Sequence, residues 1–129
     1  MILVDTSVWV AVLSRRPPFR LESRIDFREV VTCPVVVQEV LQGIRDESAF
    51  RRVRTSLLAL PMVESPVPID RFIEAATLHR LARAAGKSVR AGADCLIAAF
   101  AIRHDLEVLH RDRDFGALAE ISSLRQRSV

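Results

Sequence analysis

Two aspartates of this 129-residue chain follow short aliphatic runs, at the positions where buried strands would end. Asp5 comes after residues 2–4, which read Ile-Leu-Val, and Asp112 comes soon after residues 106–110, which read Leu-Glu-Val-Leu-His. Such runs are typical of strands in a parallel sheet, and ligands bind at the carboxyl edge of these sheets. Both carboxylates are therefore predicted to face one crevice, as metal ligands or proton acceptors.

Two further acids lie on apolar faces of predicted helices. Glu39, in the helix predicted over 34–44, shares a face with Val36, because residues three or four apart in a helix are neighbours. Asp94 lies near the start of an apolar helix within 88–102, on a face of small and aliphatic residues. Carboxylates are seldom buried without a partner, so both are candidates for the same crevice.

Each of these acids also has an ordinary structural role open to it. Asp5 could cap the helix predicted over 7–13. Glu39 could pair with Arg45, or lie at the solvent edge of its face. Asp94 could be an N-terminal acid that the helix dipole favours.

Near the end of the chain, Asp112 and Asp114 are given two different roles. Asp114 is predicted to cap a short helix over 115–121, and Asp112 to face the crevice. His110 is interpreted as a packing residue at the end of a strand, because no Ser/His/Asp spacing supports a catalytic triad.

Four carboxylates in one pocket would raise one another's pKa unless a cation lay among them. Oxygen ligands favour a hard divalent ion, Mg²⁺ or Mn²⁺. The chain has 19 basic against 16 acidic side chains, and all the basic ones but Lys87 are Arg. Arginine binds phosphate well, so a metal-loaded acidic pocket in a basic surface favours a phosphodiester substrate. A genome rich in G and C would be another cause of the arginine excess.

The elements are predicted to form an α/β fold, a three-layer α/β/α sandwich with a central parallel sheet of four to five strands and a single domain over 1–129. The predicted strands cover 2–4, 30–33, 61–64 and 106–110, and the tail 122–129 either adds a weak strand or stays loose. The predicted helices cover 7–13, 19–29, 34–44, 47–60, 69–85 and 115–121, and a further helix lies within 88–102. A basic turn over 14–18, with two prolines, is expected to end the first helix.

The composition predicts a soluble cytoplasmic protein. No apolar run approaches the roughly 18 residues of a membrane span, and no export signal precedes the first strand. Cys33 and Cys95 lack metal-site spacing, and two cysteines make a disulfide framework unlikely, which fits a reducing compartment.

The acidic motifs together resemble those of PIN-domain nucleases, specifically the VapC-type toxins of bacterial toxin–antitoxin pairs, over nearly the whole chain. They are Asp5-Thr6-Ser7 after an aliphatic strand, Glu39 in a Val-rich helix, and the stretches 94–99 and 110–115. The resemblance implies an acidic quartet of Asp5, Glu39, Asp94 and Asp112. Asp5 and Asp94 would be the most direct metal ligands, joined by Asp112. Thr6 would lie beside the metal, and Asp114 competes with Asp112 for the fourth role.

What the resemblance implies is a metal-dependent endoribonuclease that cuts tRNA, rRNA or mRNA and so inhibits translation and growth. A VapB-type antitoxin would hold it inactive, and it would form homodimers and toxin–antitoxin hetero-oligomers away from membranes. Water activated by the metal would attack phosphorus in line, with Glu39 or Asp112 orienting it or accepting its proton. Arg90 and Arg113 are candidate phosphate contacts, with solvated loop arginines as the alternative.

Two other functions are weighed against this one. A non-catalytic RNA- or protein-binding module on the same fold would be expected to have lost some of the acids, and all four are present. A metal-dependent phosphatase with an aspartyl nucleophile would require a second Asp two residues after Asp5, where this chain has Ser7.

Overall fold

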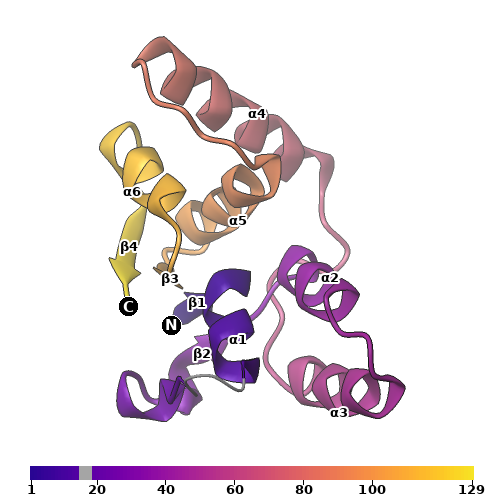
Figure 1. Ribbon diagram of the computed structural model, residues 1–129. Helices are drawn as coiled ribbons and strands as arrows, with labels where there is room; N and C mark the ends of the chain where they lie inside the picture. The colour runs from indigo at the N-terminus through magenta and orange to yellow at the C-terminus, as the bar shows by residue number, and fades with distance from the viewer. Residues whose placement is uncertain (15–18) are drawn as a thin grey trace.

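A parallel sheet of four strands lies at the centre of the computed structural model, which describes residues 1–14 and 19–129 (Figure 1). The strands are β1 (Ile2–Val4), β2 (Val30–Val31), β3 (Glu107–His110) and β4 (Arg125–Ser128). Their order across the sheet is β2-β1-β3-β4, and every pairing is parallel. The carboxyl ends of the strands therefore meet at one edge, as the sequence predicts.

Helices flank the sheet on both faces, which confirms the predicted three-layer α/β/α arrangement. In the described residues they are α1 (Thr6–Leu13), α2 (Pro34–Gln42), α3 (Glu47–Leu58), α4 (Ile69–Ala84), α5 (Gly92–Arg103) and α6 (Arg113–Glu120). The longest, α4, packs along α5 (Figure 1). Each of these helices in the described residues is too short or too polar to serve as a membrane span.

Strand β1 and helix α5 form the centre of the hydrophobic core. Leu3 and Val4 are completely buried, because β1 lies between two other strands and has helices over both faces. Helix α5 is buried without interruption from Asp94 to Ala101. Its alanines leave room for close packing, while Phe100 fills space in the core with no exposed surface.

The predicted strand over 61–64 is wrong, and the tail supplies a strand in its place. Met62 makes only an isolated bridge to Thr32, and the backbone turns away at Glu64, which has a left-handed φ of 50°. The tail forms β4 at the edge of the sheet, where backbone pairing to β3 holds a run of mainly exposed polar residues. The sheet therefore has four strands, within the predicted range of four to five.

The predicted helix over 19–29 is also wrong. Two short 3₁₀ turns, η1 (Leu21–Ser23) and η2 (Phe27–Glu29), occupy this segment. Asp26 interrupts any longer helix, because its side chain accepts a hydrogen bond from the Arg28 backbone N–H at 2.9 Å and so caps η2. Ser14 follows α1 as its C-cap, and the rest of the predicted basic turn, 15–18, lies outside the described residues.

Candidate active site

Asp5 both caps a helix and lies at the carboxyl edge of the sheet, so the two roles considered for it are compatible. Its backbone N–H donates to the Leu109 carbonyl at 2.9 Å, which joins the end of β1 to β3. Its Oδ2 accepts hydrogen bonds from the backbone N–H and the hydroxyl of Ser7 at the start of α1. Its Oδ1 is buried and has no hydrogen-bond partner within the described residues, so one oxygen remains for a ligand.

Glu39 reaches the same edge from α2. The Thr6 hydroxyl donates to Glu39 Oε1 at 2.9 Å, and this bond links the start of α1 to the middle of α2. Glu39 is partly exposed, and in the described residues it forms no ion pair with Arg45, the partner considered from sequence. Within the described residues its second oxygen accepts no hydrogen bond, so it is available to a ligand in the crevice.

Three aspartates converge from α5, from the turn after β3 and from the first turn of α6. Asp94, Asp112 and Asp114 each offer a carboxylate oxygen, and these oxygens lie within 4.8 Å of one another. Asp94 and Asp114 are buried, and Asp112 is partly exposed. The cluster thus has an interior side and a side open to solvent.

Asp112, and not Asp114, caps the helix that follows β3, although both carboxylates belong to the cluster. Asp112 is the N-cap of α6, because its Oδ1 accepts the Asp114 backbone N–H at 3.0 Å. The helix begins at Arg113, two residues earlier than predicted, so Asp114 lies in its first turn and points inward. Asp114 Oδ2 accepts the Arg90 backbone N–H at 3.1 Å and fixes the segment before α5. The prediction that Asp114 caps the helix is therefore wrong.

The charges of these acids act on one another. Burial, followed by the charges of Asp5, Asp112, Asp114 and Glu39, raises the pKa of Asp94 to about 8. Burial also raises the pKa of Asp5, although its hydrogen bonds from Ser7 oppose the shift. Side chains that are up to 109 positions apart in the sequence therefore share one electrostatic environment.

The cluster suits a hard divalent cation. Three buried carboxylate oxygens of this group of acids lack a hydrogen-bond partner in the described residues, namely Asp5 Oδ1, Asp94 Oδ2 and Asp114 Oδ1. Buried polar atoms are normally paired, and an all-oxygen set of carboxylates is the donor type that such cations prefer. Asp94, Asp112 and Asp114 therefore form an acidic cluster that could hold a metal ion.

Two side chains support the acids in ways that the sequence analysis missed. The Ser7 hydroxyl accepts the Arg111 backbone N–H at 2.9 Å while it donates to Asp5, so it bridges the two aspartate-bearing turns. His110 is buried, as expected for a packing residue, but its Nδ1 also accepts the Asp112 N–H at 3.1 Å. Its Nε2 therefore carries the proton and donates to Gln126 Oε1, 2.5 Å away on β4.

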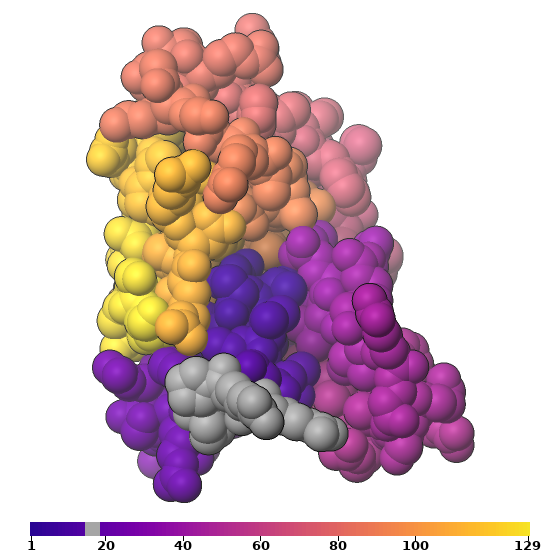
Figure 2. Space-filling view, viewed as in Figure 1, coloured from indigo at the N-terminus to yellow at the C-terminus, as the bar shows by residue number. Residues whose placement is uncertain are grey.

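The two arginines predicted to contact phosphate lie close to the acids. Arg90 is tied to Asp114 through its backbone, and its exposed guanidinium forms no ion pair with a described residue. Arg113 is exposed and lines a polar groove of about 490 Å³ together with Asp112. In Figure 2, the indigo N-terminal segment lies in a hollow between the orange-yellow residues after β3 and the purple of α2.

Comparisons with known proteins agree with this architecture. The family model described as PIN domain matches residues 2–121. Ribonuclease VapC11 of Mycobacterium tuberculosis is 37% identical over 134 aligned residues, which cover 99% of this chain and 98% of the relative. Ribonuclease VapC51 of the same species is 33% identical, over 93% of this chain and 86% of the relative.

A solved structure gives the same result at the level of the fold. VapBC-5 from Mycobacterium tuberculosis, described as a member of the VapBC family of toxin–antitoxin systems, superimposes with a TM-score of 0.70. The match covers 98% of this chain and 97% of that one, at 26% sequence identity. The chain therefore belongs to the PIN domain family, with VapC ribonucleases among its relatives.

Proposed function

We propose that this chain is a metal-dependent endoribonuclease that acts as the toxin of a toxin–antitoxin pair. The observation that carries the proposal is the cluster of carboxylates at the carboxyl edge of the sheet, with three buried oxygens unpaired. The names of the VapC ribonuclease relatives support it. The substrate would be a cellular RNA, whether tRNA, rRNA or mRNA, and the compartment would be the cytoplasm.

The acids divide into two roles. Asp5, Asp94 and Asp112 would hold Mg²⁺ or Mn²⁺, and Asp114 offers a further oxygen beside them. When bound, the ion would offset charge on the scissile phosphate and lower the pKa of water. Glu39 is partly exposed and has a free oxygen, which suits it to orient the attacking water or to accept its proton.

Positioning of these groups falls to their neighbours. Thr6 holds Glu39 in one orientation, and Asp114 holds the backbone that leads into α5. The guanidiniums of Arg90 and Arg113 form no ion pair with a described residue, and they would contact RNA phosphates, whose oxygens match their planar forks.

Incubation with RNA tests the proposal directly. Purified protein should cleave a labelled RNA pool when Mg²⁺ or Mn²⁺ is present, and a chelator should stop the reaction. Turnover of p-nitrophenyl phosphate without RNA cleavage would contradict the proposal and favour a phosphatase. RNA binding without cleavage in either metal would favour a non-catalytic module.

His110 is expected to govern metal affinity through Asp112. His110→Leu removes the acceptor for the Asp112 N–H and should weaken Mn²⁺ binding about 10- to 100-fold, the usual cost of losing support behind a ligand. His110→Asn keeps an acceptor near Nδ1 and should stay within a few-fold of wild type. Calorimetric titration with MnCl₂ measures both, and urea unfolding checks that each variant is folded. Equal affinity in the two variants would exclude this role.

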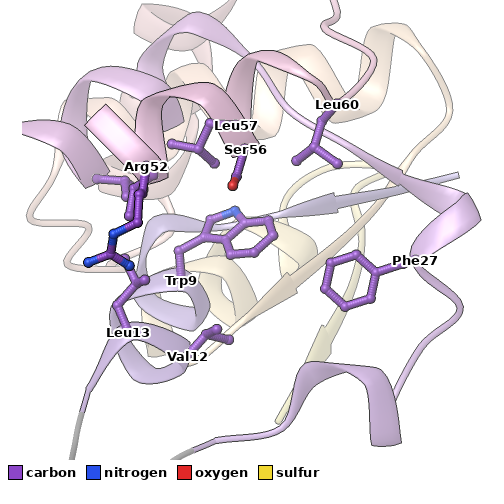
Figure 3. A pocket seen from close by; sticks show the side chains of 10 residues that line it. Trp9, Val12, Leu13, Phe27, Arg52, Ser56, Leu57 and Leu60 are labelled. Carbon is purple, nitrogen blue, oxygen red and sulfur yellow. The ribbon is translucent and has the colours of Figure 1, made fainter. Parts of the chain in front are cut away.

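The antitoxin is proposed to occupy an apolar cavity between α1 and α3. The cavity has a volume of about 300 Å³ and is enclosed by α1, α3 and η2, with Trp9, Phe27 and Leu57 in its walls (Figure 3). The Trp9 indole N–H is buried and has no hydrogen-bond partner in the described residues. An apolar antitoxin segment with a backbone carbonyl at this point would fill the space and accept that hydrogen bond. The pair is proposed to assemble further through toxin homodimers.

Trp9 is the only tryptophan of the chain, so its fluorescence reports on this cavity. Binding of the cognate antitoxin should shift the emission to shorter wavelength. Trp9→Phe keeps an aromatic ring but loses the N–H, and should weaken antitoxin binding about 10-fold, the value of one buried hydrogen bond. Leu81→Ala, at an exposed position of α4, is the control and should bind normally. Unchanged emission and unchanged affinity of Trp9→Phe would place the antitoxin elsewhere.

A further inference from the structure

Two arginines share one aromatic ring beside the acidic cluster. The guanidinium carbon of Arg111 lies 5.4 Å from the centre of the Phe19 ring, and that of Arg24 lies 6.0 Å from it. Phe19 is partly buried and packs against the core, whereas both arginines are exposed. Guanidiniums are attracted to aromatic faces, so a ring anchored in the core limits the freedom of two long side chains.

Neither guanidinium has an acidic partner in the part of the chain that the structure describes. By contrast, Arg28, on the same segment as Arg24, forms an ion pair with Asp26 at 2.7 Å. The two guanidiniums at this ring repel each other, and a bound anion would offset that repulsion. The ring, Arg24 and Arg111 therefore form an exposed cationic cluster that suits an anionic ligand, which we call the Phe19 cluster.

The Phe19 cluster is joined to the acids by a short path. The Arg111 backbone N–H donates to the Ser7 hydroxyl, which in turn donates to Asp5 Oδ2. Asp112 is the next residue after Arg111, and its carboxylate belongs to the aspartate cluster. Arg111 and Asp112 also line one groove, so an anion held by the Phe19 cluster would lie at the rim of the proposed catalytic centre.

We propose that Arg24 and Arg111, ordered by Phe19, bind a phosphodiester of the RNA substrate next to the one that is cleaved. The inference rests on the proposed ribonuclease function and adds a subsite to it. The acids at the centre repel the RNA backbone, so binding requires positive charge at their rim. Guanidiniums match phosphate oxygens in shape and charge, and ones already ordered lose less freedom on binding.

The salt dependence of RNA binding tests the subsite. The probe is a fluorescein-labelled single-stranded RNA pool of random sequence, bound in KCl without divalent ions by protein carrying Asp94→Asn to prevent cleavage. Each neutralised phosphate of a single strand contributes ~0.7 to the slope of log affinity against log salt. Adding Arg24→Ala and Arg111→Ala together should reduce that slope by about 1.4, twice the value for one contact.

Matched variants separate a specific contact from loss of charge. Arg28→Ala removes the same charge from the same segment, but its partner is Asp26, so it should leave the slope nearly unchanged. Phe19→Leu keeps both charges and removes the ring, and should weaken RNA binding several-fold because the arginines are no longer ordered. A double variant that behaves like Arg28→Ala would overturn the subsite.

The same pool distinguishes failure of the subsite from failure of the proposed function. Wild-type protein is incubated with the pool and Mg²⁺, and cleavage is scored separately from binding. Cleavage together with an unchanged slope would overturn the subsite alone. A reduced slope without cleavage would support the phosphate contacts and overturn the nuclease.

Discussion

RNA cleavage is expected to fall at least about 100-fold when Asp5 or Asp94 is replaced by Asn, because even losing a residue behind a metal ligand costs 10- to 100-fold. Asn has nearly the size of Asp and keeps one oxygen, so the change removes mainly the negative charge. Asp5 and Asp94 both carry a buried oxygen without a hydrogen-bond partner in the described residues. The measurement is the initial rate on labelled RNA at saturating Mg²⁺.

A surface aspartate provides the control for this experiment. Asp70 is exposed in the first turn of α4, and Asp70→Asn should cleave RNA at the wild-type rate. All variants are purified in parallel, so that a contaminating nuclease would appear equally in each. Rates within tenfold of wild type for both Asp5→Asn and Asp94→Asn would refute the assignment of the acids.

Without metal, Asp94→Asn is expected to make the protein more stable than wild type at alkaline pH. The pKa of Asp94 is about 8 in the folded protein and 3.8 in its ordinary state. Between these values the folded state holds a proton that the unfolded state has released, so stability falls as pH rises through this window. Asn never ionises, so at pH 9 the free energy of unfolding of the variant should exceed that of wild type by at least about 1 kcal/mol. A shift of a single pKa unit would already correspond to ~1.4 kcal/mol.

With divalent metal bound, wild type should be more stable than Asp94→Asn at pH 9. A bound cation favours the ionised carboxylates, so Mg²⁺ should stabilise wild type more at pH 9 than at pH 6, where protons compete for Asp94. Urea unfolding with chelator and with Mg²⁺ at both pH values measures the effect. Asp70→Asn should follow wild type throughout. A variant Asp94→Asn that is less stable than wild type in chelator at pH 9 would contradict the electrostatic account.

The parts of the fold that the sequence predicts are those with a strong local pattern. Strand β1 is a run of aliphatic residues, and α2 begins with a proline at its first turn, where proline is preferred. Strand β4 has no such pattern, since it reads Arg-Gln-Arg-Ser and is mostly exposed. It forms because backbone groups of β3 are available and because Arg127 pairs with Glu107 at 3.0 Å on that neighbour. Tertiary pairing of this kind has no signal in a single sequence.

The candidate site likewise has parts that a local sequence pattern predicts and parts that depend on tertiary contacts. The positions of the acids are predictable because strand ends and helix faces place them. The exchange between Asp112 and Asp114 depends on a two-residue difference in where α6 begins. The spacing of two aspartates before a helix is compatible with either register, so only the backbone decides. The roles of Ser7 and His110 depend on bonds to backbone N–H groups of distant turns, and side-chain type alone does not reveal them.

The order of strands has a consequence for the cell that makes this protein. The central strand β1 is synthesised first, but its neighbour β3 begins only at Glu107, and the last acid of the group is Asp114. A growing polypeptide therefore lacks part of this group of acids until Asp114 has been synthesised. Activity of the kind proposed above would therefore appear only late in the synthesis of the fold.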